Sequence, residues 1–117
     1  MKKLLWVDDE RDPFENNGHW LAYAPFITND VVWVKSYDEF VSWIIENGLP
    51  DGISFDHDLG DTVNPKEKTG FECAKWLVDY CLDNDSTLPE FTSQSSNPAG
   101  RKNILGLLNN FKKYNEI

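Results

Sequence analysis

The sequence predicts a three-layer α/β fold built on a four-stranded parallel sheet with strand order 2-1-3-4. Short apolar runs alternate with amphipathic helical segments, which is the pattern of parallel strands joined by right-handed crossover helices. Two of the runs end abruptly in carboxylates, Asp8 and Asp9 after the first and Asp56 after the third. Because unpaired charge is costly inside a buried strand, these side chains are expected at the carboxyl ends of their strands.

The bulk properties indicate one domain spanning residues 1–117 and exclude several classes of partner. A net charge of −9 argues against general DNA binding or an anionic membrane surface, since both need a basic footprint. It permits one nucleotide or RNA end held by a few local cations. No run approaches the ~20 apolar residues of a membrane span, and the first apolar run stops at Asp8, too early for a signal peptide. Cys73 and Cys81 lie eight residues apart in one predicted helix, roughly 12 Å along its axis, so they read as reduced core residues of a cytoplasmic protein.

The first half of the chain contains two predicted strands and one helix. Residues 3–7 form the first strand, and residues 12–30 form a long loop on the active face with a turn of helix near residues 20–24. Residues 31–34 form the second strand. Ser36 begins a helix with Glu39 as its capping box, and Gly48 followed by Pro50 ends that helix.

The second half repeats the pattern twice. Residues 52–55 form the third strand, and residues 60–68 form a polar loop before a helix that begins with the capping box of Thr69 and Glu72. Residues 89–93 form a weaker fourth strand. Asn97 and Pro98 then read as the N-cap and first residue of a last helix.

Four short parallel strands in this order suit a small flavodoxin-like sheet, whose strand order reverses between the first and third strands. Ligands of such sheets bind at that switch point, outside the carboxyl ends of the strands. Asp8, Asp9 and Asp56 follow the two strands concerned, so the sequence predicts that they share one pocket.

Three clustered carboxylates suit a hard divalent cation, Mg²⁺ or Mn²⁺, which prefers oxygen ligands. We therefore predict Asp8, Asp9 and Asp56 as metal ligands. In the alternative interpretation, one aspartate of the region only caps a turn, for which Asp58 is the better candidate. His57 is a candidate general acid because an imidazole exchanges protons near neutral pH; alternatively its ring points away and hydrogen-bonds the backbone.

A phosphate site is predicted where the fourth strand meets the last helix. Ser95, Asn97 and Gly100 supply a hydroxyl, small residues and free N–H groups at a helix N-terminus, and Arg101 adds positive charge. The same residues also read as an ordinary helix start. Arg11 either clamps a phosphate bidentately or neutralises Asp8 or Glu10.

Together these motifs resemble the cyclic-phosphate-processing receiver-like domain, a shortened relative of the two-component receiver domain found in bacteria and their phages. The resemblance spans nearly the whole chain and is carried by the following motifs: Asp8-Asp9-x-Arg11, Ser54-Phe55-Asp56-His57-Asp58-Leu59-Gly60, Thr69-Gly70 with Ala74-Lys75-Trp76-Leu77, and Ser95-x-Asn97-Pro98-x-Gly100 followed by Asn103-Ile104. It implies a receiver-like fold with an acidic metal pocket and an activity on cyclic phosphates, including those at RNA ends.

The resemblance also implies roles for individual residues. Asp8, Asp9 and Asp56 match the receiver's acidic pocket, with Asp56 at its phosphoacceptor position. The family's own additions are matched by His57, Asp58, Ser95 and Asn97. The chain departs from the pattern at Gln94, where the family often has a histidine, and it has no fifth strand with the receiver's lysine.

The leading function is therefore a magnesium-dependent phosphoesterase that hydrolyses or opens a cyclic phosphate on a nucleotide or RNA end. His57, Asp56 and Asp58 are its predicted catalytic residues. One alternative is a signalling or interaction domain phosphorylated on Asp56. Another is a non-catalytic nucleotide binder, which a phage would use to sequester a signal. The true substrate, the oligomeric state and whether catalysis occurs at all stay open at this point.

Overall fold

The computed structural model describes residues 2–59 and 68–115, and its centre is a four-stranded parallel sheet. The strand order β2-β1-β3-β4 confirms the predicted topology. The predicted second strand begins one residue earlier and the fourth one residue later than expected. The strands are β1 (Lys3–Val7), β2 (Asp30–Val34), β3 (Gly52–Phe55) and β4 (Glu90–Ser93).

Three α-helices follow the last three strands, and each begins where its capping residue predicts. In α1 (Tyr37–Asn47) the Ser36 hydroxyl accepts the N–H of Glu39 at 3.1 Å. In α2 (Gly70–Asp83) the Thr69 hydroxyl accepts the N–H of Phe71 at 3.2 Å, rather than that of the predicted partner Glu72. In α3 (Pro98–Asn115) the Asn97 side-chain oxygen accepts the N–H of Gly100 at 3.0 Å. No helix in these described residues is long and apolar enough to cross a membrane.

The connection between β1 and β2 is more ordered than predicted. A 3₁₀ helix, η1 (Glu15–Tyr23), replaces the expected loop with a turn of helix near residues 20–24. It is set up at Asp12, whose carboxylate accepts the N–H of Phe14 at 2.8 Å and whose carbonyl accepts that of Glu15 at 3.1 Å. Asp12 and Pro13 are residue types that favour such a tight turn. A 3₁₀ helix has three residues per turn, so its sequence lacks the 3.6-residue apolar period that predicts an α-helix.

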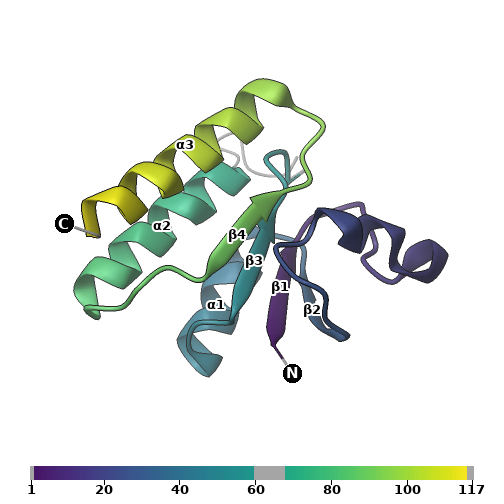
Figure 1. Ribbon diagram of the computed structural model, residues 1–117, viewed down its shortest axis with the longest axis horizontal. Coiled ribbons are helices and arrows are strands. Elements are labelled where there is room, and N and C mark those ends of the chain that lie inside the picture. The colour runs from purple at the N-terminus through teal and green to yellow at the C-terminus, as the bar shows by residue number, and fades with distance from the viewer. Residues whose placement is uncertain (1, 60–67, 116–117) are drawn as a thin grey trace.

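The two faces of the sheet are covered differently. Figure 1 shows α1, α2 and α3 on one side and η1 on the other. Leu5, Val7, Ile53 and Phe55 join the apolar cluster on the helix side, and Cys73 and Cys81 of α2 are buried there as free thiols. Burial of each large apolar side chain in this cluster contributes about 1.5–3 kcal/mol.

The opposite face of the sheet is covered by η1 and by the segment that follows it in the chain. Leu4 and Trp6 are fully buried without belonging to the helix-side cluster. At Gly52 a Cβ would lie 2.5 Å from the ring of Phe26, so only glycine lets this segment lie so close to β3. Both faces of β1 and β3 are thus shielded, which leaves the carboxyl ends of these strands as the place for polar side chains.

The predicted polar loop of residues 60–68 lies, apart from Lys68, outside the described residues, so the structure does not address that prediction.

Candidate functional site

The parallel register brings the first and third strand ends together. Val7 pairs with Phe55, and the ladder continues one step because the N–H of Asp56 donates to the carbonyl of Val7 at 2.8 Å. One carboxylate oxygen each of Asp8, Asp9 and Asp56 lies within 4.8 Å of the others. Asp8 is fully buried, Asp56 is buried and Asp9 is half-buried. The predicted acidic cluster is therefore present at the carboxyl ends of β1 and β3.

Arg11 lies within this cluster. Its Nη1 atom is 3.4 Å from Asp8 Oδ2 and 3.6 Å from Asp56 Oδ1, and its side chain is only 20% exposed. The guanidinium stacks over Trp20 of η1 at 5.0 Å from the ring centroid. The side chain thus neutralises Asp8, as one of the two interpretations of the sequence expects, and it reaches Asp56 as well.

Asp8 is held in a fixed orientation by the turn that follows it. Its Oδ1 accepts the N–H groups of Glu10 at 3.0 Å and Arg11 at 2.9 Å, and its carbonyl accepts the indole N–H of Trp33 at 2.7 Å. The indole N–H of Trp6 likewise donates to the Arg11 carbonyl at 2.9 Å. The sequence does not predict these two hydrogen bonds, because a tryptophan in an apolar strand gives no signal of where its N–H points.

Gln94 is the polar residue whose role the sequence did not reveal. It is buried, and its Nε2 donates to the Val7 carbonyl at 3.0 Å and to Asp8 Oδ2 at 3.2 Å. Its Oε1 accepts the hydroxyl of Ser54 at 2.6 Å. One side chain therefore connects the ends of β1, β3 and β4. The only sequence signal is the period of two that places it on the same face as Thr92.

The buried cluster has three carboxylates and one neighbouring guanidinium, that of Arg11. Desolvation, followed by the charge of Asp8, raises the pKa of Asp56 to about 6, and Arg11 opposes this only in part. Desolvation is also the main cause that raises the pKa of Asp9. The three carboxylates and their unmet charge fit a hard divalent cation, which binds oxygen ligands and relieves such repulsion. These residues could hold a metal ion.

His57 and Asp58, directly after Asp56, form a second pair. His57 Nδ1 lies 3.0 Å from Asp58 Oδ1, and Asp58 Oδ2 accepts the Asn97 amide at 3.3 Å. The hydrogen bond with His57 is the main cause that lowers the pKa of Asp58. When Nδ1 carries the proton for Asp58, its 3.5 Å contact with Asn97 Nδ2 joins two donors and is not a hydrogen bond. The second ring nitrogen is then the one left for proton exchange.

The residues between β4 and α3 hold each other. Ser95 Oγ accepts the N–H of Asn97 at 3.1 Å, Asn97 Oδ1 accepts that of Gly100, and the Asn97 carbonyl accepts that of Arg101 at 2.9 Å. At Gly100 a Cβ would lie 2.3 Å from Cγ of His57, so this glycine lets α3 approach the imidazole. The segment is thus a helix start that positions His57. The side chain of Arg101 lines a groove beside β4.

A parallel sheet with this strand order and an acidic cluster at its carboxyl edge defines a receiver-like α/β protein. The family model described as the cyclic-phosphate processing receiver domain matches residues 3–110, and the chain belongs to that family. The resemblance drawn from the sequence motifs is confirmed.

One similar solved structure is a fusion of the yeast Spc42 trimeric coiled coil, amino acids 181–211, to another structure. It is 21% identical with a TM-score of 0.55, and the match covers 91% of this chain. The chain spans only 61% of that chain's length, and at this identity the likeness shows the fold alone. No curated protein matches the sequence.

Proposed function

We propose that the protein hydrolyses or opens a cyclic phosphate on a nucleotide or RNA end with the help of a divalent ion. The observation that carries this proposal is the adjacency of two chemical groups at the end of β3. Asp56 belongs to the acidic cluster, and the next two residues form the His57–Asp58 pair. A candidate charge-binding residue and a candidate proton-exchange pair thus follow the same strand on consecutive residues, and phosphoryl transfer uses groups of both kinds.

Asp8, Asp9 and Asp56 would hold the ion, with Mg²⁺ or Mn²⁺ as the species that suits an all-carboxylate set. A divalent ion bound there supplies positive charge that polarises a phosphoryl oxygen. Gln94 and the N–H groups of the turn after β1 orient Asp8 for this task. Arg11 provides further positive charge at the same place, and its partial exposure leaves it able to contact a phosphate.

His57 would exchange the proton. Asp58 accepts the hydrogen bond of Nδ1–H and fixes the orientation of the ring. With Nε2 also protonated, the ring would give the Nε2 proton to the leaving ribose oxygen as water forms the new bond to phosphorus. Gly100 lets the start of α3 close against the imidazole ring. The ring is held on two sides, and a general acid works best in such a fixed geometry.

The start of α3 would contribute to phosphate binding through groups that are not already engaged. Asn97 and Gly100 serve the internal hydrogen bonds, and Ser95 Oγ orients Asn97. Among the described residues, the N–H of Ala99 has no backbone acceptor, as expected for a helix N-terminus. This N–H would hold negative charge on the phosphate, whereas the side chain of Arg101 lines the groove beside β4.

The test is incubation of the protein and Mg²⁺ with 2′,3′-cyclic nucleotides and with an RNA that ends in a cyclic phosphate, followed by phosphorus NMR. We expect new phosphomonoester resonances, and their loss in Asp56→Asn. Asp79→Asn, an exposed substitution of the same type on α2, is the matched control. Shifted resonances without new products would identify a non-catalytic binder, and unchanged spectra would exclude the reaction for these substrates.

The position of Asp56 favours a second candidate function. It stands at the carboxyl end of β3 with Asp8 and Asp9 around it, as a phosphoacceptor of the receiver type would. Incubation with acetyl phosphate would then add about 80 Da to the wild type, read by mass spectrometry, and nothing to Asp56→Asn.

A further inference from the structure

β4 is an edge strand, and half of its backbone groups point away from the sheet. Among the strands of residues 2–59 and 68–115, it pairs only with β3. The N–H of Glu90 donates to the carbonyl of Asp51, just before β3, at 3.1 Å. The N–H of Gln94 donates to the carbonyl of Phe55, at the end of β3, at 3.2 Å. Because residues of a parallel strand alternate in direction, Phe91 and Ser93 direct their N–H and C=O groups away from β3. Phe91 is half-buried and Ser93 is only 3% exposed, and both line the groove beside the strand. Such an edge is a template for another strand.

A groove of about 650 Å³ runs along this edge. It is bounded on one side by a face of α3 and on the other by Pro25, from the segment that follows η1. β4 is its floor, so the groove has the position of a fifth strand in the sheet. Its lining includes the apolar side chains of Leu88, Pro89, Phe91 and Leu105.

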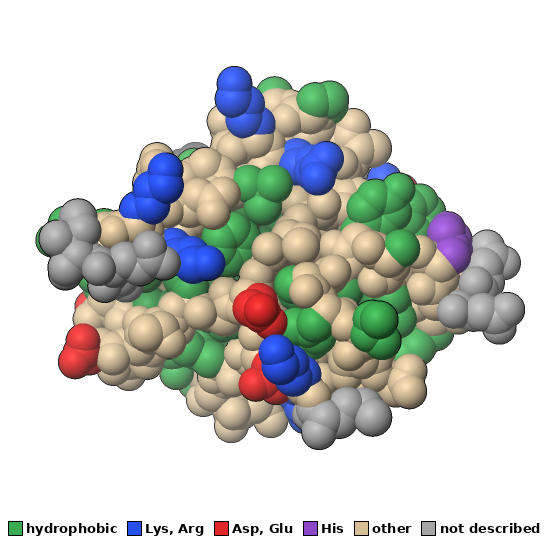
Figure 2. Space-filling view, viewed as in Figure 1, with side chains coloured by type: hydrophobic (Ala, Val, Ile, Leu, Met, Phe, Trp, Pro, Cys, Tyr) green, Lys and Arg blue, Asp and Glu red, His purple; other side chains and the backbone are tan. Residues whose placement is uncertain are grey.

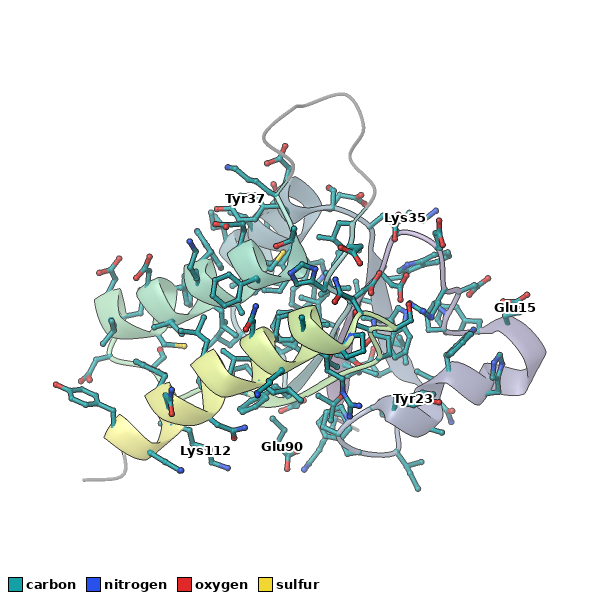
Figure 3. The ribbon with its side chains drawn as sticks, turned by 90° about the horizontal axis from the view of Figure 1, so that it is seen from above. Glu15, Tyr23, Lys35, Tyr37, Glu90 and Lys112 are labelled. Carbon is teal, nitrogen blue, oxygen red and sulfur yellow. The ribbon has the colours of Figure 1, made fainter. Side chains whose placement is uncertain are left out.

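The α3 wall of the groove carries positive charge at both ends. Arg101 and Lys112 are 11 residues apart, which is three helical turns and about 16 Å, and Leu105 lies between them on the same face. Neither cation takes part in an ion pair within the described part of the chain. Figure 3 shows Lys112 and Glu90 projecting to the same side of the molecule. The chain as a whole carries −9, but α3 has four cationic side chains and no carboxylate.

Figure 2 has the viewpoint of Figure 1, in which β4 is the strand nearest the viewer. On this face, exposed hydrophobic side chains lie between blue side chains on the upper left and a small red group at the lower centre. The surface thus combines apolar contact area with positive charge along α3, while Glu90, which also lines the groove, is paired with Lys2 at 3.4 Å.

We propose that this groove binds an extended acidic segment of a partner protein, which adds to β4 as a fifth strand. The backbone groups of Phe91 and Ser93 would pair with the segment, a mode of recognition that supplies affinity through main-chain hydrogen bonds. Every second side chain of the segment would face α3. Carboxylates six residues apart, about 20 Å, reach Arg101 and Lys112, and apolar residues between them contact Leu105. Charge complementarity favours this occupant over a second copy of the acidic chain.

The experiment uses two seven-residue peptides with blocked ends, Glu-Thr-Val-Thr-Ile-Thr-Glu and the same sequence with lysine at both ends. Binding to the whole ¹⁵N-labelled chain is followed by amide shifts and hydrogen exchange. We expect the acidic peptide to shift and protect the N–H groups of Phe91 and Ser93, and the lysine peptide to bind more weakly. Lys112→Glu should raise the Kd of the acidic peptide about fivefold or more and improve binding of the lysine peptide.

Lys113→Glu is the matched control, because it makes the same charge change on an exposed residue that does not line the groove. Equal effects of Lys112→Glu and Lys113→Glu would overturn the proposal, as would unchanged Phe91 and Ser93 amides at millimolar acidic peptide. A single-stranded oligouridylate that shifts these amides when the peptide does not would assign the groove to RNA. Shifts that depend on protein concentration alone would assign it to self-association. All of these readouts are independent of turnover at the acidic site.

Discussion

Gln94 donates a hydrogen bond from its Nε2 atom to Asp8 Oδ2 at 3.2 Å, across the carboxyl ends of β4 and β1. The amide of Gln94, which follows β4, therefore orients a candidate metal ligand that follows β1. These two strands are not neighbours in the sheet. The amide is a neutral donor that neither supplies nor takes up a proton. Where the family often has a histidine, this chain thus has an orienting group, and in the proposed reaction the proton exchange rests on His57.

Removal of this amide should destabilise the protein and weaken its metal site. Gln94→Leu removes one buried hydrogen bond each from Asp8 Oδ2, the Val7 carbonyl and the Ser54 hydroxyl. We expect unfolding to become easier by about 1–3 kcal/mol, measured by urea denaturation. Ser96→Ala, an exposed change two residues away, should have little effect. A Gln94→Leu variant with unchanged stability and unchanged Mg²⁺ affinity would contradict the role given to this amide.

A divalent cation should stabilise the wild type through Asp56. Free Mg²⁺ at ten times its Kd would add about 1.4 kcal/mol, read as a rise in Tm. Asp56→Asn removes a ligand and one of the three repelling charges. The variant should therefore be more stable than the wild type without metal and respond weakly to Mg²⁺. Equal melting temperatures of both proteins, with and without the ion, would contradict the proposal that Asp56 binds a divalent cation.

The stability of the metal-free protein should fall as the pH rises from about 4 to 7. The pKa of Asp56 is about 6 in the folded protein and about 4 when unfolded. A raised folded pKa means that this contribution is present below pH 4 and is lost as the pH passes 6. The loss amounts to about 2–3 kcal/mol at most. Melts in EDTA from pH 4 to 8 should show it as a difference between wild type and Asp56→Asn, and parallel curves would disprove it.

The ring of His57 should matter for turnover and not for metal affinity. His57→Ala should slow the proposed reaction by about 10²- to 10⁴-fold, measured as initial rate of cyclic-phosphate loss, while Mg²⁺ still raises Tm. His19→Ala changes an exposed histidine on η1 and is the control. If both histidine variants keep the wild-type rate, the general-acid role is wrong.

Two glycines of α3 should respond in opposite ways to alanine. Gly100→Ala places a Cβ 2.3 Å from Cγ of His57, and overpacking of this kind costs about 1–3 kcal/mol. It should also displace the ring and slow turnover. Gly106→Ala meets no atom within 4 Å and should stabilise the helix by up to about 1 kcal/mol. Unfolding curves of the two variants test this, and a stabilising Gly100→Ala would show that the ring is not packed as described.

Much of the fold can be predicted from the sequence alone, because its signals are local. Apolar runs of four or five residues, Ser36, Thr69 and Asn97 as helix caps, and the alternation of strand and helix predict the sheet and its order. The acidic cluster also follows, since carboxylates after two neighbouring parallel strands must emerge at one edge. The helix η1 lacks such a signal, because a 3₁₀ segment has no amphipathic period of its own.

Only the tertiary structure determines how the site is supported. The bond from Gln94 to Asp8 joins residues 86 positions apart, and the contact of Gly100 with His57 joins the start of α3 to the end of β3. Neither leaves a pattern in the sequence, since each depends on the distance and angle between whole elements. The groove beside β4 is of the same kind, because it forms only where α3 and the segment after η1 flank an unpaired strand edge. Residue types and their order thus determine which groups reach the edge of the sheet, and packing between distant segments determines what holds them there.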